Sequence, residues 1–145
     1  MSDQKLSIAS ISIANIKLLD QFIATYKDDK GHFRYFETRD SAIISNHLAT
    51  FILLADAEPI GYGHLDKEGE RVWLGIAIKT EYQGYGMGKL MMQMLIAKAR
   101  LSGVDKVHLS VDNCNTLGIR LYEKFGFTND KIDDDKRRMV WVNPS

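Results

Sequence analysis

The stretch EYQGYGMGKL, residues 81–90, carries three glycines at alternate positions directly before a long apolar run. Glycine weakens a helix interior by about 1 kcal/mol, so Gly84, Gly86 and Gly88 must meet a need other than helix formation. A strand ending near Ile78, a glycine-rich turn and a new helix would place several unpaired backbone N–H groups around one point. Such a point suits a phosphate, because glycine allows close approach and the helix dipole favours negative charge.

Two common phosphate-binding motifs do not fit this stretch. The dinucleotide fingerprint G-x-G-x-x-G would need glycine in place of Lys89, and the strands expected upstream are antiparallel, unlike a βαβ unit. The P-loop motif would need glycine in place of Gln83 and a hydroxyl residue in place of Leu90. The alternative without any ligand is a tight strand-to-helix turn that the glycines shape for its own sake.

Two motifs follow one another in the second half of the chain. Gln83–Gly88 reads QGYGMG, and about thirty residues later Asn115–Phe127 reads NTLGIRLYEKFGF. They resemble the Q/R-x-x-G-x-G/A loop and the N-x-x-x-x-x-L-Y-x-K-x-G-F signature of the GNAT family, which are acetyl-CoA-dependent N-acetyltransferases. The resemblance extends to the order of elements along the chain, although the N-terminal third and the last hairpin match in pattern only. The alternative for the second motif is a buried amphipathic helix with Tyr122 as a core residue.

The resemblance implies where acetyl-CoA would bind. Backbone groups of one strand would pair with the pantetheine arm, and N–H groups of the glycine loop would hold the pyrophosphate. The positions implied for the cofactor are Ile76, Ala77, Ile78, Gln83, Gly84, Tyr85, Gly86, Met87, Gly88, Lys89, Asn115, Tyr122 and Lys124.

The resemblance also implies a catalytic acid. Tyr122 would lie near the thioester sulfur, where a phenol with an ordinary pKa of about 10 can protonate the departing thiolate. An amine would attack the thioester directly, and a backbone N–H near Ile78 would stabilise the oxyanion. Because no covalent enzyme intermediate is needed, Cys114 is expected to be a small residue at a helix entry rather than a nucleophile.

The general base stays open among Glu70, His64, His108 and water. Glu70 precedes a predicted strand near where several relatives hold a basic carboxylate, so it is the side chain named as catalytic beside the tyrosine. For each candidate the alternative is a solvated turn charge or a satisfied strand histidine. N-terminal protein acetyltransferases of this family carry glutamate where Ser110 stands here, which argues against a ribosomal-protein acceptor.

An aromatic and basic cluster lies between the first predicted helices, a part of the chain that the resemblance implies would wall the acceptor pocket. Its members proposed to bind substrate are Phe33, Arg34, Tyr35 and Arg39. Aromatic rings with arginine suit a ring and an anion, so the expected acceptor is a small amine such as an amino sugar or sugar nucleotide. Surface packing explains the cluster about as well. The alternatives are a protein N-terminal or lysine acetyltransferase and a non-catalytic CoA-binding module.

The elements that must position these residues follow from periodicity. Strands are expected at residues 5–9, 51–55, 60–65, 72–78 and 107–111 and in a hairpin reaching Met139–Val142, with helices after Ser12, at 41–45, after Gly86 and after Asn115. The long helix after Gly86 should bury an apolar stripe of Leu90, Met94, Ala97 and Leu101, which Met87, Met91 and Leu95 widen. The last helix, after Asn115, carries the apolar residues Leu117, Leu121 and Phe125. The fold class is α/β (α+β, mixed sheet), in the order β-α-α-β-β-β-α-β-α-β-β.

Composition bounds the class of partner. The 145 residues fit a single domain, 1–145, and contain 19 basic and 19 acidic side chains, so no positive field attracts nucleic acid or a membrane. Met1–Lys5 leads into the chain without the apolar stretch of a secretory signal, which predicts a cytoplasmic protein. One cysteine and four scattered histidines predict neither a disulfide nor a metal site. A homodimer is possible, since dimers are frequent in this family.

Overall fold

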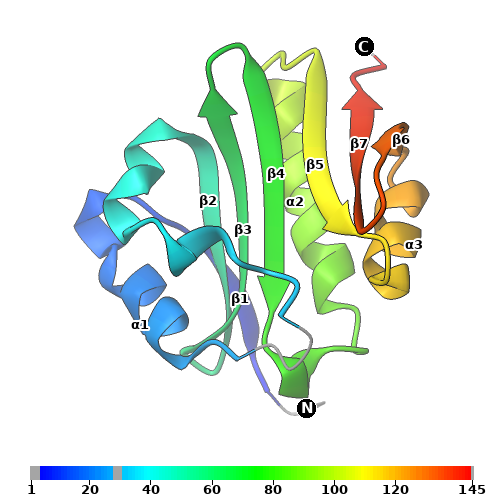
Figure 1. Cartoon of the computed structure of the whole chain (residues 1–145). Coiled ribbons are helices and arrows are strands. Elements are labelled where there is room, and N and C mark those ends of the chain that lie inside the picture. Colours follow the sequence, from blue (N-terminus) through cyan, green and yellow to red (C-terminus); the bar gives the residue numbers. More distant parts are fainter. Residues whose placement is uncertain (1–3, 28–30, 145) are drawn as a thin grey trace.

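A seven-stranded mixed sheet in the order β1-β2-β3-β4-β5-β7-β6 forms the centre of the computed structural model (Figure 1). The structure describes residues 4–27 and 31–144, so the leading stretch Met1–Lys5 is described only from Gln4. The strands are β1 (Leu6–Ser10), β2 (His47–Ala55), β3 (Glu58–Glu68), β4 (Arg71–Ile78), β5 (Lys106–Asp112), β6 (Thr128–Ile132) and β7 (Lys136–Val142). The α-helices are α1 (Lys17–Thr25), α2 (Met87–Leu101) and α3 (Thr116–Lys124).

The predicted mixed sheet is confirmed. β4 and β5 are parallel, because α2 carries the chain back between them, and the other neighbouring strands pair antiparallel. The second predicted helix is instead a 3₁₀ helix, η3 (Ser41–Asn46), which follows a shorter one, η2 (Tyr35–Glu37). Asp40 starts η3 by accepting a hydrogen bond from the Ala42 N–H at 2.9 Å, but six residues give too few hydrogen bonds to favour an α-helix.

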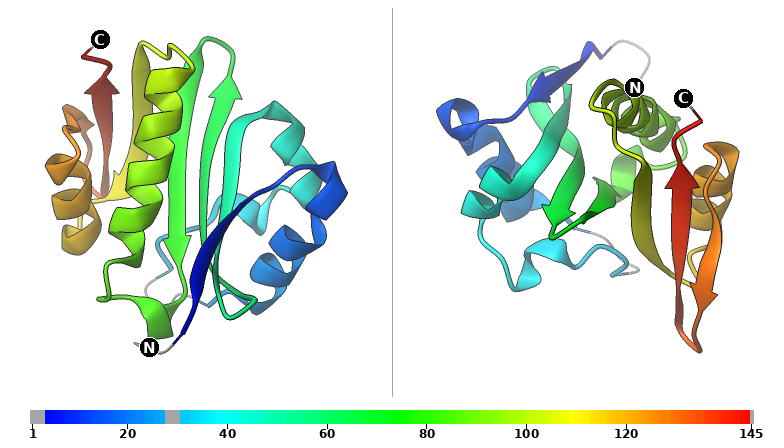
Figure 2. Two further views of the ribbon diagram at one scale, coloured as in Figure 1. Left: turned by 180° about the vertical axis from the view of Figure 1, so that it is seen from behind. Right: turned by 90° about the horizontal axis from the view of Figure 1, so that it is seen from above.

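Helices cover both faces of the sheet (Figure 2). α2 packs on one face over a core that includes Leu53, Leu65 and Leu109, and α1 packs on the other over Ile52 and Tyr62. No helix within residues 4–27 or 31–144 combines the length and the apolar character needed to cross a lipid bilayer. α2, the longest helix, therefore supports the sheet on the face opposite α1.

The buried face of α2 differs from the predicted stripe. Leu90 and Met94 are partly exposed, Ala97 is exposed, and Leu101 is 86% exposed. The side chains that contact the sheet are Met87, Met91, Met92, Leu95, Ile96 and Ala99. Both stripes repeat at helical spacing, so periodicity alone does not choose between them. Gly63 on β3 helps to select the face, because a Cβ there would lie 2.5 Å from the Met91 sulfur.

The last helix departs from its predicted stripe in the same way. Leu117 is exposed, whereas Ile119 and Tyr122 are the buried residues of α3. Its predicted start holds, since the Asn115 side chain accepts a hydrogen bond from the Gly118 N–H at 3.0 Å. Ile119 and Tyr122 therefore pack in the core, whereas Leu117 and Leu121 line a cavity beside it.

Two leucine-to-alanine substitutions on α2 test which face is buried. Leu95→Ala should lower the free energy of unfolding by about 2–5 kcal/mol, because it leaves a cavity at a fully buried site. Leu101→Ala, the matched control on the exposed side, should change it by less than about 0.5 kcal/mol. Urea unfolding followed by circular dichroism measures both, and equal effects of the two substitutions would contradict the packing described.

Candidate active site

The seam between β4 and β5 opens part-way along the sheet. Their one paired position in the described chain is Trp73↔His108, beyond which the strands move apart toward the start of α2 (Figure 1). β4 nevertheless keeps its antiparallel partner β3 as far as Gly61↔Ile78. The edge of β4 that faces β5 therefore carries backbone groups without a strand partner, and such an edge accepts an extended ligand.

A cavity of about 850 Å³ occupies this opening. Its walls include residues 74–78 of β4 and residues 110–112 of β5. It is lined by every position implied for acetyl-CoA except one, namely Ile76, Ala77, Ile78, Gln83, Gly84, Gly86, Met87, Gly88, Lys89, Asn115, Tyr122 and Lys124. Tyr85 is the exception, since it is 59% exposed and does not line the cavity.

The glycine loop forms an open cradle at one end of this cavity. Gly84 and Gly86 have φ angles of 84° and 82°, in the left-handed region that favours glycine, and a Cβ at either would meet nothing within 4 Å. Gly86 is the N-cap of α2 and contributes no side-chain cap, so the first N–H groups of this helix are not covered by a capping side chain. The Gln83 side chain donates to the Ile78 carbonyl at 2.9 Å and fixes the loop to β4. The cradle therefore fits a phosphate group.

Tyr122 projects from α3 into the same cavity. It is 9% exposed and packs against Phe127 with ring centroids 6.1 Å apart. Burial raises the pKa of its hydroxyl to about 12, because an ionised phenolate loses its hydration there. At neutral pH the hydroxyl is therefore a proton donor.

A second cavity, of about 350 Å³, lies on the α1 face of the sheet. The four side chains predicted to bind substrate, Phe33, Arg34, Tyr35 and Arg39, all line it, together with His32, His64, Asp66, Glu68, Trp73, Leu74, Gly75 and Ser110. The two cavities share His32, Phe33, Leu74, Gly75 and Ser110, so they meet where β4 and β5 begin to separate. This junction is where a molecule in one cavity can reach a molecule in the other.

The candidate bases lie in different surroundings. Glu70 is exposed in the turn between β3 and β4 and lines neither cavity. His108 packs beside Trp73 and also lines neither. His64 lines the second cavity, and a Cβ on Gly75 would lie 2.5 Å from its Nε2, so this nitrogen faces the junction. The structure therefore brings only His64 of these three to the site.

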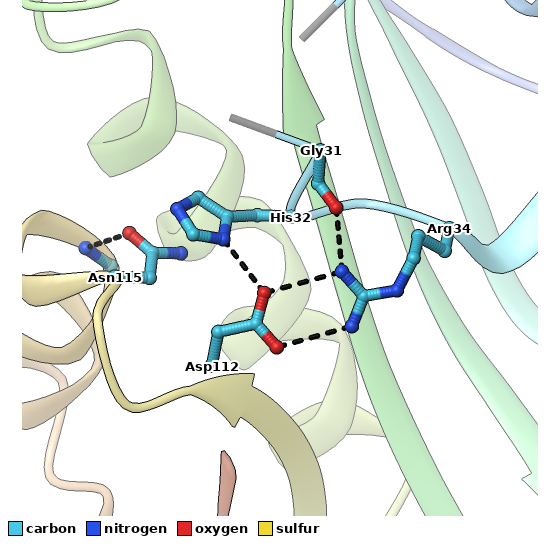
Figure 3. A network of polar contacts seen from close by, with 6 residues as sticks. Gly31, His32, Arg34, Asp112 and Asn115 are labelled. Carbon is cyan, nitrogen blue, oxygen red and sulfur yellow. Dashed lines mark hydrogen bonds and ion pairs between the residues drawn. The ribbon is translucent and has the colours of Figure 1, made fainter. Parts of the chain in front are cut away.

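An ionic network missed by the sequence analysis ties the segment after residue 31 to the end of β5 (Figure 3). Asp112 accepts from both terminal nitrogens of Arg34, at 3.1 and 3.2 Å, and lies 2.7 Å from the Nδ1 atom of His32. The Arg34 hydrogen bond is the main cause that lowers the pKa of Asp112. Arg34 and Asp112 are 78 positions apart, and nothing in the sequence pattern links them.

A second network lies beside the second cavity, which Tyr35 and Asp66 line. The Tyr35 hydroxyl donates to Asp66 Oδ2 at 2.7 Å and lies 2.8 Å from His47 Nε2, and His47 Nδ1 lies 2.8 Å from the Thr50 hydroxyl. Burial is the main cause that lowers the pKa of His47 to about 4 and that of His64 well below its ordinary value. Both imidazoles are therefore neutral at neutral pH.

These two buried histidines should make folding sensitive to mild acid. In the unfolded chain they bind protons near pH 6.5, whereas in the folded protein the pKa of His47 is about 4 and burial holds the pKa of His64 well below its ordinary value. Since the unfolded state then binds more protons, the free energy of unfolding should decrease as the pH falls from 6.5 toward 4. Urea unfolding at a series of pH values measures this slope. His47→Gln should make it shallower, and a slope of zero would contradict the assignment.

Comparisons with known proteins agree with this architecture. A model described as Acetyltransferase (GNAT) family matches residues 15–127. The spermine/spermidine N(1)-acetyltransferase of Bacillus subtilis (strain 168) is 41% identical over 78 residues, which make up 52% of this chain and 51% of that protein. A mycothiol acetyltransferase of Thermobispora bispora is 38% identical over 63 residues, which make up 43% of this chain and 21% of that protein. The matches thus span between about a fifth and a half of these curated relatives.

Solved structures share the fold across nearly the whole chain. The GNAT domain of S. lividans PAT superposes with a TM-score of 0.77 at 16% identity, covering 93% of this chain and 89% of that one. The ribosomal-protein-S18-alanine N-acetyltransferase from Escherichia coli gives a TM-score of 0.72 at 18% identity, covering 97% and 96%. The match to the family model, over most of the sequence, confirms the resemblance of the two motifs: the chain belongs to the GNAT acetyltransferase family.

Proposed function

We propose that this protein transfers an acetyl group from acetyl-CoA to a primary amine of a small molecule by direct attack. The observation that carries the proposal is the meeting of two cavities at the opened β4–β5 seam, one beside a phosphate cradle and Tyr122, the other beside the aromatic segment. Two similar folds support the choice of donor, since structures from Thermoplasma acidophilum and Bacillus subtilis were solved in complex with CoA.

The glycine loop and β4 would hold the acetyl donor. N–H groups from Gly84 to Lys89 would bind the pyrophosphate, and the free edge of β4 at residues 76–78 would pair with the pantetheine arm. Lys124 and Asn115 line the same cavity and would contact the donor along α3. The bound donor supplies a thioester, an acetyl group already activated toward an amine.

The residues at the junction would carry the proton transfers. His64 is the side chain we propose as general base, because its Nε2 faces Gly75 at the junction while its Nδ1 lies 2.6 Å from the Tyr62 hydroxyl, with water as the alternative. Tyr122 would protonate the departing thiolate, and a backbone N–H near Ile78 would stabilise the oxyanion by about 3 kcal/mol. The predicted role of Glu70 as base has no support in its exposed position outside both cavities.

The lining of the second cavity favours a small cationic acceptor over an anionic one. The amino-sugar or sugar-nucleotide acceptor expected from the sequence required an arginine to bind its anionic group. Arg34 is instead paired with Asp112, and Arg39 lies over the Tyr35 ring beside Glu68, so both arginines already have partners. A volume of about 350 Å³ suits a small molecule better than a peptide. A protein acceptor is the second candidate, because a ribosomal protein bS18-alanine acetyltransferase from Haemophilus influenzae is 37% identical over 76 residues.

Replacing the catalytic hydroxyl tests the mechanism. Tyr122→Phe should lower kcat by about 10²–10⁴-fold, because general acid catalysis is lost, while the KM for acetyl-CoA should stay unchanged because the ring is retained. Release of free thiol from acetyl-CoA with a panel of amines measures both constants. Tyr85→Phe is the matched control and should leave kcat unchanged, because it removes only an exposed hydroxyl outside the cavity and keeps the backbone N–H proposed to bind the pyrophosphate.

Two results would count against the proposal. An unaltered kcat in Tyr122→Phe would show that Tyr122 is not the general acid, although the proposed acetyl transfer itself would stand. If the wild-type protein releases no thiol with any amine while calorimetry still detects CoA binding, the protein is a CoA-binding module rather than an enzyme.

A further inference from the structure

One buried carboxylate oxygen in the second cavity has no partner. Asp66 is 2% exposed, and its Oδ2 atom accepts the hydrogen bond from Tyr35 at 2.7 Å. Its Oδ1 atom has no hydrogen-bond partner among residues 4–27 and 31–144. Removing a carboxylate from water is costly unless it is paired and hydrogen-bonded, so an oxygen left in this state calls for a donor from outside the chain.

The groups packed around Asp66 do not supply a countercharge. His47 and His64 are neutral because burial lowers their pKa values, and burial together with the Asp66 contact raises the pKa of Tyr35 above its ordinary value. Arg39 also lines the cavity. Its guanidinium carbon lies 4.3 Å from the centroid of the Tyr35 ring, and its Nη2 atom lies 3.8 Å from Glu68 Oε1. No ion pair within the described chain includes Asp66, so this buried carboxyl group has no salt-bridge partner there.

The walls beside Asp66 suit a cation. Phe33 and Trp73 line the same cavity, and aromatic faces attract an ammonium group, whereas the Tyr35 ring is already covered by Arg39. Asp66 lies opposite Trp73 in the β3–β4 register, two positions before Gly75, where the cavities meet. At the rise of a β-strand, two positions correspond to about 7 Å.

We propose that Asp66 is the counterion for a second, non-reacting ammonium group of the acceptor, which is therefore a small aliphatic diamine or a longer amine of the same kind. This inference rests on the proposed function, since it assigns the far end of the same acceptor. The reacting nitrogen must lose its proton and approach the thioester within about 3–3.5 Å. A carboxylate beside it would keep it protonated, so a charge about 7 Å away suits the other amine.

A comparison of two amines with one substitution tests the proposal. The wild-type protein should show a higher kcat/KM for diaminobutane than for butylamine, which has the same carbon chain but one amine. Asp66→Asn should lower kcat/KM for diaminobutane by about 10-fold to 100-fold, as expected for loss of a hydrogen bond to a charged group, and change that for butylamine by less than about twofold. Asparagine keeps an oxygen that can accept from Tyr35.

Glu68→Gln is the matched control, because Glu68 also lines the cavity but is exposed and already contacts Arg39. It should reduce the preference for diaminobutane much less than Asp66→Asn does. An equal loss for both amines in Asp66→Asn would assign Asp66 to structure alone and overturn the proposal. The absence of any diamine preference in the wild-type protein would overturn it as well.

Calorimetry separates this inference from the proposed function and remains decisive if Asp66→Asn does not fold. Diaminobutane should bind the wild-type protein more tightly than butylamine, whether or not acetyl transfer follows. If diaminobutane binds with this preference but no amine releases thiol, the proposed function fails and the ammonium site stands. If butylamine is acetylated and diaminobutane binds no better, the function stands and the ammonium site fails.

Discussion

The site depends on the opening of one seam in an otherwise continuous sheet. β4 is paired with β3 along its whole length and β5 with β7 along its whole length, so separating β4 from β5 removes few hydrogen bonds. What the separation leaves is an extended edge of backbone groups inside a large cavity. The pairing of β4 with β3 and of β5 with β7 thus keeps both strands in the sheet while the space between them stays open. The candidate active site lies in this space.

The two faces of the sheet differ in the side chains that they carry. On the side of α2 the core is apolar, and Gly63 lets Met91 and Leu95 approach the strand closely. On the opposite face the strands present polar side chains, and the segment after residue 31 crosses over them (Figure 1). Because α2 supports the sheet from behind, the opposite face can carry buried polar groups near the seam without the loss of the main core.

Those polar groups form two networks of different character. The Asp112 network is fully paired and anchors the covering segment to β5 through Arg34 (Figure 3). The network of Tyr35, His47 and Asp66 is built from neutral donors around one carboxylate, and one oxygen of that carboxylate is left without a partner. The first network therefore positions a wall of the second cavity, whereas the second leaves one carboxyl oxygen to be satisfied from outside the described chain.

The sequence by itself determined the features that depend on local backbone and periodicity. It predicted the order of the strands along the chain, a backbone need for glycine at positions 84 and 86, and the cap at Asn115. Only the tertiary structure decided which face of α2 is buried, where β4 leaves β5, and that Asp112 meets Arg34. These outcomes rest on contacts between segments far apart in the chain, and the energy of such contacts depends on packing rather than on residue spacing.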